Sequence, residues 1–248
     1  MTTDGLILAS LPSSGSDWFA QALCASDPAL IYAREYFCPF VNWEQAERLE
    51  RTLGDTLLRN SERLTQGITA TALSELVEDT WKRSGATFTK ENYIPFQVET
   101  FAERFRVIIL LREFRLTFPP NRRRVLLWYE HFGQALISAG RLDSFCESHA
   151  KTPMNRAALG HYWFSRRYMD AARTIGCPVV WFGQLMNMTE QEITDAVAMP
   201  GINAEQLARQ VVLTRKPIAR PEEHMPQWAA AYELHSELEQ RYGSEESR

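Results

Sequence analysis

Residues 6–19 read LILASLPSSGSDWF, a run that combines a strand, a tight turn and the start of a helix. The apolar stretch Leu6–Leu11 has the length of a strand and stops at Pro12, and a helical pattern follows over Asp17–Leu23. A turn of small residues between a strand and a helix presents free backbone N–H groups to an anion, and Gly15 can adopt a positive φ. The stretch therefore predicts a phosphate-binding turn, with an ordinary β-to-α connection as the alternative.

Apolar runs alternate with helical patterns along the rest of the chain. Val107–Leu111 holds five consecutive apolar residues, which is typical of a central parallel strand covered on both faces. Shorter strands are expected over Leu30–Tyr32, Gly67–Ala70, Ala86–Thr89 and Pro178–Phe182. Helix N-caps are expected at Thr152, Thr189 and Asn203. The segment 114–126, which holds two prolines and three consecutive arginines, is expected to be a loop. This alternation predicts an α/β fold of three layers, with a mostly parallel central sheet and helices on both faces.

The composition of the chain is that of an ordinary globular protein. It has 248 residues, of which 45% are hydrophobic, and its net charge of -4 argues against a general nucleic-acid binder. Its four cysteines lie far apart and form no zinc-binding pattern, so we expect free thiols, no metal site and a cytoplasmic location. We expect no signal peptide and no transmembrane segment, because no apolar run approaches the roughly 20 residues of a membrane span. One domain is expected over residues 1–243, with a disordered tail at 244–248.

Several motifs resemble those of the sulfotransferases that use 3′-phosphoadenosine 5′-phosphosulfate as donor. Pro12–Trp18 resembles a degraded copy of their turn, K/R-SGTTW, and Val107–Arg112 is similar to their second motif, an apolar strand followed by arginine. Weaker similarities lie at Ala33–Phe37, Phe182–Leu185 and Arg215–Lys216. The first of these three segments resembles bacterial carbohydrate and trehalose sulfotransferases. The resemblance covers residues 5–243 and implies a P-loop NTPase-like fold, in which the two apolar runs are adjacent inner strands.

The resemblance also implies which residues bind the nucleotide and which residue acts on the acceptor. The residues implied to bind the nucleotide are Ser13, Ser14, Gly15, Ser16, Asp17, Trp18, Arg112, Thr117, Arg215 and Lys216. Among them, the turn would hold the 5′-phosphosulfate, Trp18 would lie near the adenine, Arg112 would bind the 3′-phosphate, and the last two would close over the nucleotide. Thr117 would replace a serine of the family that falls on Pro120 here. Glu35 corresponds to the glutamate base of the bacterial members, or is an exposed surface glutamate.

Some of these positions admit more than one interpretation. Ser13 stands where the family has Lys or Arg, so the cation that faces the leaving oxygen is missing from the turn. Lys90, at the end of an expected strand, would replace that cation or is a solvated loop lysine. Asp17 would repel a bound phosphosulfate, and helix capping is its other interpretation. The planar fork of Arg112 fits a phosphate, with a salt bridge to Glu113 as the alternative.

The sequence therefore predicts an enzyme with Glu35 and Lys90 as catalytic residues. It would transfer a sulfuryl group from 3′-phosphoadenosine 5′-phosphosulfate to a hydroxyl of a carbohydrate or another small metabolite. Such an in-line displacement needs positioning and charge stabilisation, so no metal is expected. One alternative is another P-loop enzyme such as a small-molecule kinase, although no lysine follows Gly15 as a Walker A loop requires. The other is a non-catalytic nucleotide-binding or interaction protein on the same fold, which the missing turn cation favours.

Overall fold

The structure is a computed structural model that describes residues 5–12, 14–33, 78, 81–82, 85–92, 98–117, 123–138, 140–216 and 228–243. Ser13, Glu35, the strand expected over Gly67–Ala70 and the tail at 244–248 lie outside the described residues, so what was predicted for them stays a prediction. The chain divides into two compact units. The first comprises Met1–Cys38, Ser61–Glu113 and Arg167–Ile218, and the second comprises Pro39–Asn60, Phe114–Arg166 and Ala219–Arg248. The expectation of one domain over residues 1–243 likewise stays a prediction.

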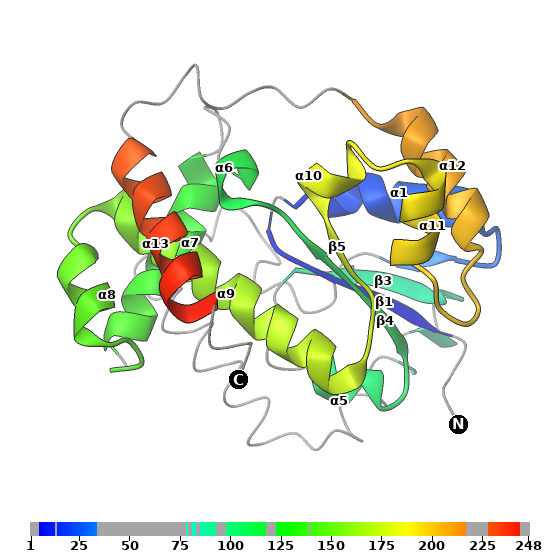
Figure 1. Ribbon diagram of the computed structural model, residues 1–248. Coiled ribbons are helices and arrows are strands. Elements are labelled where there is room, and N and C mark those ends of the chain that lie inside the picture. Colours follow the sequence, from blue (N-terminus) through cyan, green and yellow to red (C-terminus); the bar gives the residue numbers. More distant parts are fainter. Residues whose placement is uncertain are drawn as a thin grey trace. The chain divides into compact units, whose positions relative to one another are not determined.

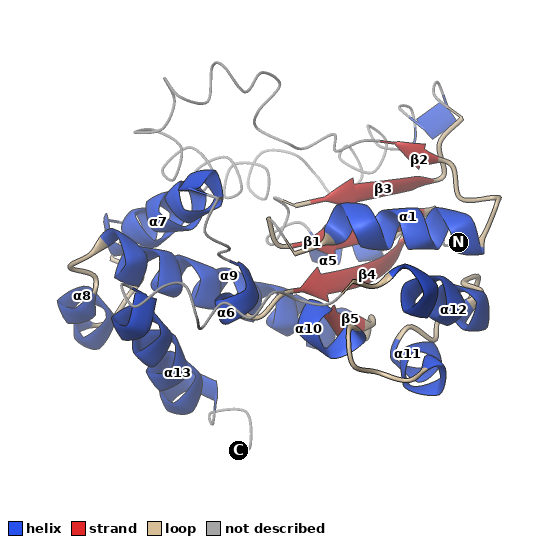
Figure 2. Ribbon diagram, turned by 90° about the horizontal axis from the view of Figure 1, so that it is seen from above, coloured by secondary structure: helices blue, strands red, loops and turns tan. Residues whose placement is uncertain are grey.

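The first unit is built around a parallel β-sheet (Figure 2). Among the described residues its strands are β1 (Leu6–Ser10), β2 (Tyr32–Ala33), β3 (Phe88–Glu91), β4 (Arg106–Leu111) and β5 (Val179–Trp181), in the spatial order β2-β3-β1-β4-β5. Leu6 of β1 aligns with Arg106 of β4 on one side and with Phe88 of β3 on the other. The prediction that the two apolar runs are adjacent inner strands is therefore confirmed.

Helices cover both faces of this sheet. On one face, Leu6 and Leu8 of β1 pack with Phe19 and Leu23 of α1 (Ser16–Ser26) in one buried cluster. The same layer contains α10 (Phe182–Leu185), α11 (Glu190–Ala196) and α12 (Ala204–Thr214). The opposite face carries α5 (Val98–Ala102) and the last residues of α9 (Pro153–Ile175), whose Tyr168 hydroxyl donates a 3.2 Å hydrogen bond to the carbonyl of Ser10 (Figure 1). The predicted α/β fold with a parallel sheet between helical layers is confirmed.

The second unit is helical in its described residues. Its helices are α6 (Phe114–Thr117), α7 (Arg123–Ser138), α8 (Ser144–His149), the first part of α9, and α13 (Ala229–Gly243). α7 and α9 approach each other closely at Gly133 and Gly160. A Cβ atom on Gly133 would collide with the carbonyl of Arg156, and one on Gly160 would collide with the carbonyl of Tyr129. Only glycine at these two positions allows the two helix backbones to come so near.

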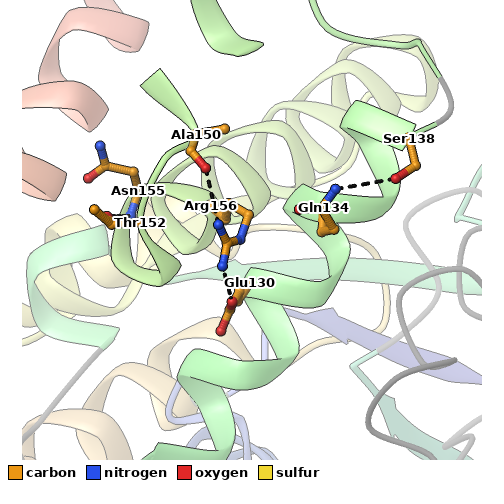
Figure 3. Close-up of polar contacts among 7 residues, drawn as sticks. All are labelled: Glu130, Gln134, Ser138, Ala150, Thr152, Asn155 and Arg156. Atoms are coloured by element: carbon orange, nitrogen blue, oxygen red, sulfur yellow. Dashed lines mark hydrogen bonds and ion pairs between the residues drawn. The ribbon is translucent and has the colours of Figure 1, made fainter. Parts of the chain in front are cut away.

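The start of α9 is fixed by an N-cap and by an ion pair to α7 (Figure 3). The N–H of Asn155 donates a 3.1 Å hydrogen bond to Oγ1 of Thr152, so the cap expected at Thr152 is confirmed. The next residue, Arg156, forms a 2.6 Å ion pair with Glu130 of α7 and donates a 3.2 Å hydrogen bond to the carbonyl of Ala150. The guanidinium thus links the first turn of α9 to both the preceding turn and the neighbouring helix.

Two other caps in the first unit agree with the sequence. The side chain of Thr189 accepts from the N–H of Glu192, whose carboxylate accepts in return from the N–H of Thr189, which makes a complete capping box before α11. The side chain of Asn203 accepts from the N–H of Gln206 at the start of α12. Both caps are confirmed. No helix in the described part of the chain is both long and apolar enough to cross a membrane.

The loop expected over 114–126 is wrong at both of its described ends. Residues 114–117 form α6, and α7 begins at Arg123. Phe114 explains the first difference, because its ring is buried and stacks on the imidazole of His235 with 4.6 Å between the ring centroids. The free energy of burying this aromatic side chain outweighs the local preference for a turn.

Candidate functional site

The C-terminal end of β1 lies at the switch point of the sheet, where the order in which strands are added changes from one side of β1 to the other. The chain first adds β2 and β3 on one side of β1 and then adds β4 and β5 on the other. In open parallel sheets, ligands bind outside the C-terminal ends of the strands at such a switch point. The turn that leads from β1 into α1 occupies this position (Figure 2).

The turn combines a glycine of positive φ with the first residues of a helix. The N–H of Ser14 donates a 3.1 Å hydrogen bond to the carbonyl of Leu11, and Gly15 follows as the N-cap of α1 with φ 85°. A Cβ atom at Gly15 would collide with the ring of Phe182, so both the backbone angle and the space require glycine. The N–H of Phe19 donates a 3.0 Å hydrogen bond to the carbonyl of Gly15. No described residue accepts a hydrogen bond from the three preceding N–H groups of α1, those of residues 16–18.

A buried polar contact ties the turn to the next strand. The hydroxyl groups of Ser10 and Ser16 both donate to Oδ1 of Asn92, over 2.5 Å and 3.3 Å. Asn92 follows β3 directly, so one amide joins the ends of β1 and β3 to the first residue of α1. The hydroxyl of Ser14 is also buried, and no described residue offers it a hydrogen bond. Buried hydroxyl groups are normally hydrogen-bonded.

Lys90 is buried beside the first turn of α1. Its side chain is 5% exposed, and its Nζ lies 2.7 Å from Oδ1 of Asp17, whose side chain is 78% exposed. The alternative of a solvated loop lysine is therefore wrong. The capping interpretation of Asp17 is also wrong, because Gly15 is the N-cap and no side chain caps the helix. The amino group of Lys90 thus lies next to the first turn of α1, close to the turn that follows β1.

An aromatic and cationic cluster stands on the other side of the turn. The guanidinium of Arg112 lies over the ring of Phe182, with 4.4 Å between its carbon and the ring centroid. The same ring meets the indole of Trp18 edge to face at 5.7 Å. The indole N–H donates a 2.9 Å hydrogen bond to the hydroxyl of Thr214, at the end of α12. Glu113 accepts a 2.9 Å hydrogen bond from the N–H of Gly183.

The structure brings most of the predicted nucleotide-binding residues to one end of the sheet. Thr214 is followed at once by Arg215, which donates a 2.8 Å hydrogen bond to the carbonyl of Met188, and by the exposed Lys216. The contact between Trp18 and Thr214 brings the end of α12, which Arg215 and Lys216 follow directly, next to the first turn of α1. Thr117 is different, since it belongs to the second unit, where its buried hydroxyl lies 3.3 Å from Nε2 of His161.

Sequence reasoning missed the state of Glu91. This residue ends β3, is fully buried and accepts a 2.8 Å hydrogen bond from the hydroxyl of Thr89. A buried carboxylate at the end of a strand is a chemically notable group, because burial of charge is costly. The only signal in the sequence was the position of Glu91 directly after Lys90. The pattern of residues along a strand does not reveal whether the last residue of that strand is buried by other parts of the protein.

A second polar chain, also missed, lies inside the second unit. Nδ1 of His161 is 3.2 Å from Nε2 of His235, and Nδ1 of His235 is 3.4 Å from a carboxylate oxygen of Glu239. Burial, together with the positive charge of Arg115, lowers the pKa of His235 to about 3. The two histidines are 74 residues apart and show no ligand spacing in the sequence, which is why their contact was not predicted. No group of three or more His, Cys, Asp or Glu residues in the described part of the chain is arranged to hold a metal ion.

Comparison with protein-family models finds no match to this chain, and comparisons with curated proteins and with solved structures find none either.

Proposed function

We propose that this protein binds 3′-phosphoadenosine 5′-phosphosulfate at the turn after β1 and transfers its sulfuryl group to a hydroxyl of a carbohydrate or small metabolite. The observation that carries the proposal is the burial of Lys90 beside the first turn of α1. Burying an ammonium group is costly, and its position next to free helix N–H groups suits a ligand with several negative charges.

The chemistry assigns a distinct task to each group. The acceptor oxygen forms a bond to sulfur as the bond between sulfur and the 5′-phosphate oxygen breaks, and negative charge grows on that leaving oxygen. Lys90 and the free N–H groups of α1 would stabilise this charge, as the cation of the turn does in the sulfotransferases that the sequence resembles. Arg112 would bind the 3′-phosphate, and Glu35 would accept the proton of the acceptor hydroxyl.

The site supports a P-loop-like arrangement more than an ordinary β-to-α connection. The turn follows the central strand, stands at the switch point of the sheet and contains a glycine with a positive φ. An ordinary connection does not require a buried lysine from the neighbouring strand. A non-catalytic nucleotide-binding protein is the second candidate, and the carboxylate of Asp17 next to Lys90 is the observation in its favour.

Calorimetry with three nucleotides tests the proposal. We expect 3′-phosphoadenosine 5′-phosphate to bind more tightly than ATP or GTP, because only the first ligand has a 3′-phosphate for Arg112. Preference for ATP together with Mg²⁺ would favour a kinase instead. Heat of binding for none of the three would contradict a nucleotide site.

Replacing Arg112 by alanine tests the assignment of the 3′-phosphate. The variant should bind 3′-phosphoadenosine 5′-phosphate more weakly by about 1.5–3 kcal/mol, the range of a hydrogen bond to a charged group. Adenosine 5′-phosphate, which lacks the 3′-phosphate, should be affected much less. Arg209→Ala is the matched control, since the Arg209 side chain is 60% exposed on α12. Equal losses for both ligands would show that Arg112 does not recognise the 3′-phosphate.

A further inference from the structure

The carboxylate of Asp17 makes the two electrostatic contacts that a bound phosphate would make, with the N-terminal end of α1 and with Lys90. It is the acidic residue in the first turn of α1, where the positive end of the helix dipole attracts an anion. Its carboxylate oxygen lies 2.7 Å from Nζ of Lys90, the buried cation of the proposed site. The positive end of the helix dipole and the amino group of Lys90 would both favour a ligand phosphate. Both already lie next to a carboxylate of the protein itself.

The two partners of this ion pair are in very different surroundings. The Lys90 side chain is 5% exposed and the Asp17 side chain is 78% exposed. A buried ammonium needs an anionic partner, because leaving it unpaired is strongly unfavourable. An exposed carboxylate has no such need, since water solvates it when it turns away. The lysine is therefore the fixed member of the pair, and the aspartate is the member that can be exchanged.

We propose that Asp17 is a built-in competitor for the anion site, which pairs with Lys90 in the free protein and must be displaced by a phosphate group of the ligand. This inference rests on the proposed function only for the identity of the natural ligand. A group with one negative charge merely matches the carboxylate that it replaces, whereas a phosphosulfate or a terminal phosphate, each with two negative charges, gains from the exchange. The exchange therefore selects ligands of higher charge.

The variant Asp17→Asn separates a competitor from a positioning residue. Removing the carboxylate should tighten binding of 3′-phosphoadenosine 5′-phosphate and of pyrophosphate by about 10-fold, since the displaced charge and its repulsion of the ligand both disappear. The same variant should unfold at a lower temperature than the wild type without ligand, because the 2.7 Å ion pair between Lys90 and Asp17 is lost. Ligand should then raise its unfolding temperature by more than it raises that of the wild type.

Two further variants complete the experiment. Asp195→Asn is the matched control, because it removes one negative charge from an exposed position on α11 and should leave both affinities unchanged. In Lys90→Met, the additional change Asp17→Asn should give a clearly smaller gain than in the wild type, because Asp17 has no lysine to pair with and only its repulsion of the ligand is removed. Formate offers a third readout, since in Asp17→Ala it should raise the unfolding temperature and weaken pyrophosphate binding by competition.

Each outcome decides the inference. If Asp17→Asn binds 3′-phosphoadenosine 5′-phosphate and pyrophosphate more weakly than the wild type, the inference is wrong and Asp17 instead positions Lys90. Unchanged affinity for both ligands would also overturn the inference. If Asp17→Asn gains affinity for pyrophosphate while the adenosine nucleotide is not preferred over ATP, the inference stands and the proposed function fails. If neither the wild type nor the variant binds any of these anions, both are wrong.

Discussion

Replacing Lys90 by methionine is expected to lower the rate of sulfuryl transfer by about 10²–10³-fold, the usual effect of removing one group that stabilises a developing oxyanion. Lys90 is the buried cation next to the turn after β1, and Ser13 supplies no charge there. Methionine has a similar length and no charge, so it fills the same space. The Asp17 side chain left behind is 78% exposed, and water solvates it without a large loss of stability.

The measurement uses labelled 3′-phosphoadenosine 5′-phosphosulfate with a panel of sugars and alcohols as acceptors. Lys82→Met is the matched control, because Lys82 is an exposed lysine of the first unit. The circular dichroism spectrum and the unfolding temperature show whether Lys90→Met still folds. A folded Lys90→Met protein with the full rate would remove Lys90 from the mechanism, while equal loss in both lysine variants would point to a general effect of charge.

The stability of the second unit is expected to fall as the pH is lowered below about 6.5. Burial and the charge of Arg115 lower the pKa of His235 to about 3 in the folded protein, from a model value of 6.5. Between these two values the unfolded chain binds a proton that the folded chain does not bind, so protonation favours unfolding. At about 1.36 kcal/mol per pKa unit, the free energy of unfolding should fall by about 2 kcal/mol at pH 5 and by about 4 kcal/mol near pH 3.

Urea denaturation from pH 8 to pH 4, followed by tryptophan fluorescence, measures this dependence. His235→Phe should show a shallower fall in unfolding free energy, because phenylalanine keeps a flat ring to stack on Phe114 but cannot be protonated. The same substitution at His149, which is half-buried on α8, is the control. If the wild type and His235→Phe lose stability equally between pH 6.5 and pH 5, the acid sensitivity does not come from His235.

The strands, the turn and the caps could be predicted because their signals are local. A run such as Val107–Leu111 indicates a buried central strand by itself, and the cap at Thr189 needs only the four residues of its own box. The pair of Lys90 and Asp17 could not be predicted in the same way. It depends on the alignment of Leu8 with Lys90, which directs the lysine toward α1, and a single sequence does not reveal which residues of two strands align.

Packing between distant segments explains the remaining differences. α6 exists because Phe114 is buried among aromatic rings from α9 and α13, and neither helix is visible in the local sequence around it. The contact of His161 with His235 joins residues that are 74 positions apart. For the candidate site, the sequence indicated which residue types gather at the C-terminal ends of the strands. It did not indicate that Lys90 and Glu91 are both buried there.

β1 is the central strand of the sheet, but its neighbours are far away along the chain. Its partners in β3 and β4 lie about 80 and 100 residues later. At about 5–20 residues per second, a ribosome needs roughly 4–16 s to synthesise the chain from β1 to β3, the earlier of these two partners. During that time neither β3 nor β4 is present to pair with the apolar run Leu6–Leu11, which makes the nascent chain prone to aggregation. The turn that follows β1 is thus synthesised early, but its packing partners are synthesised late. Phe182 packs against Gly15 and Trp18, Thr214 accepts a hydrogen bond from Trp18, and both residues follow β4 in the chain.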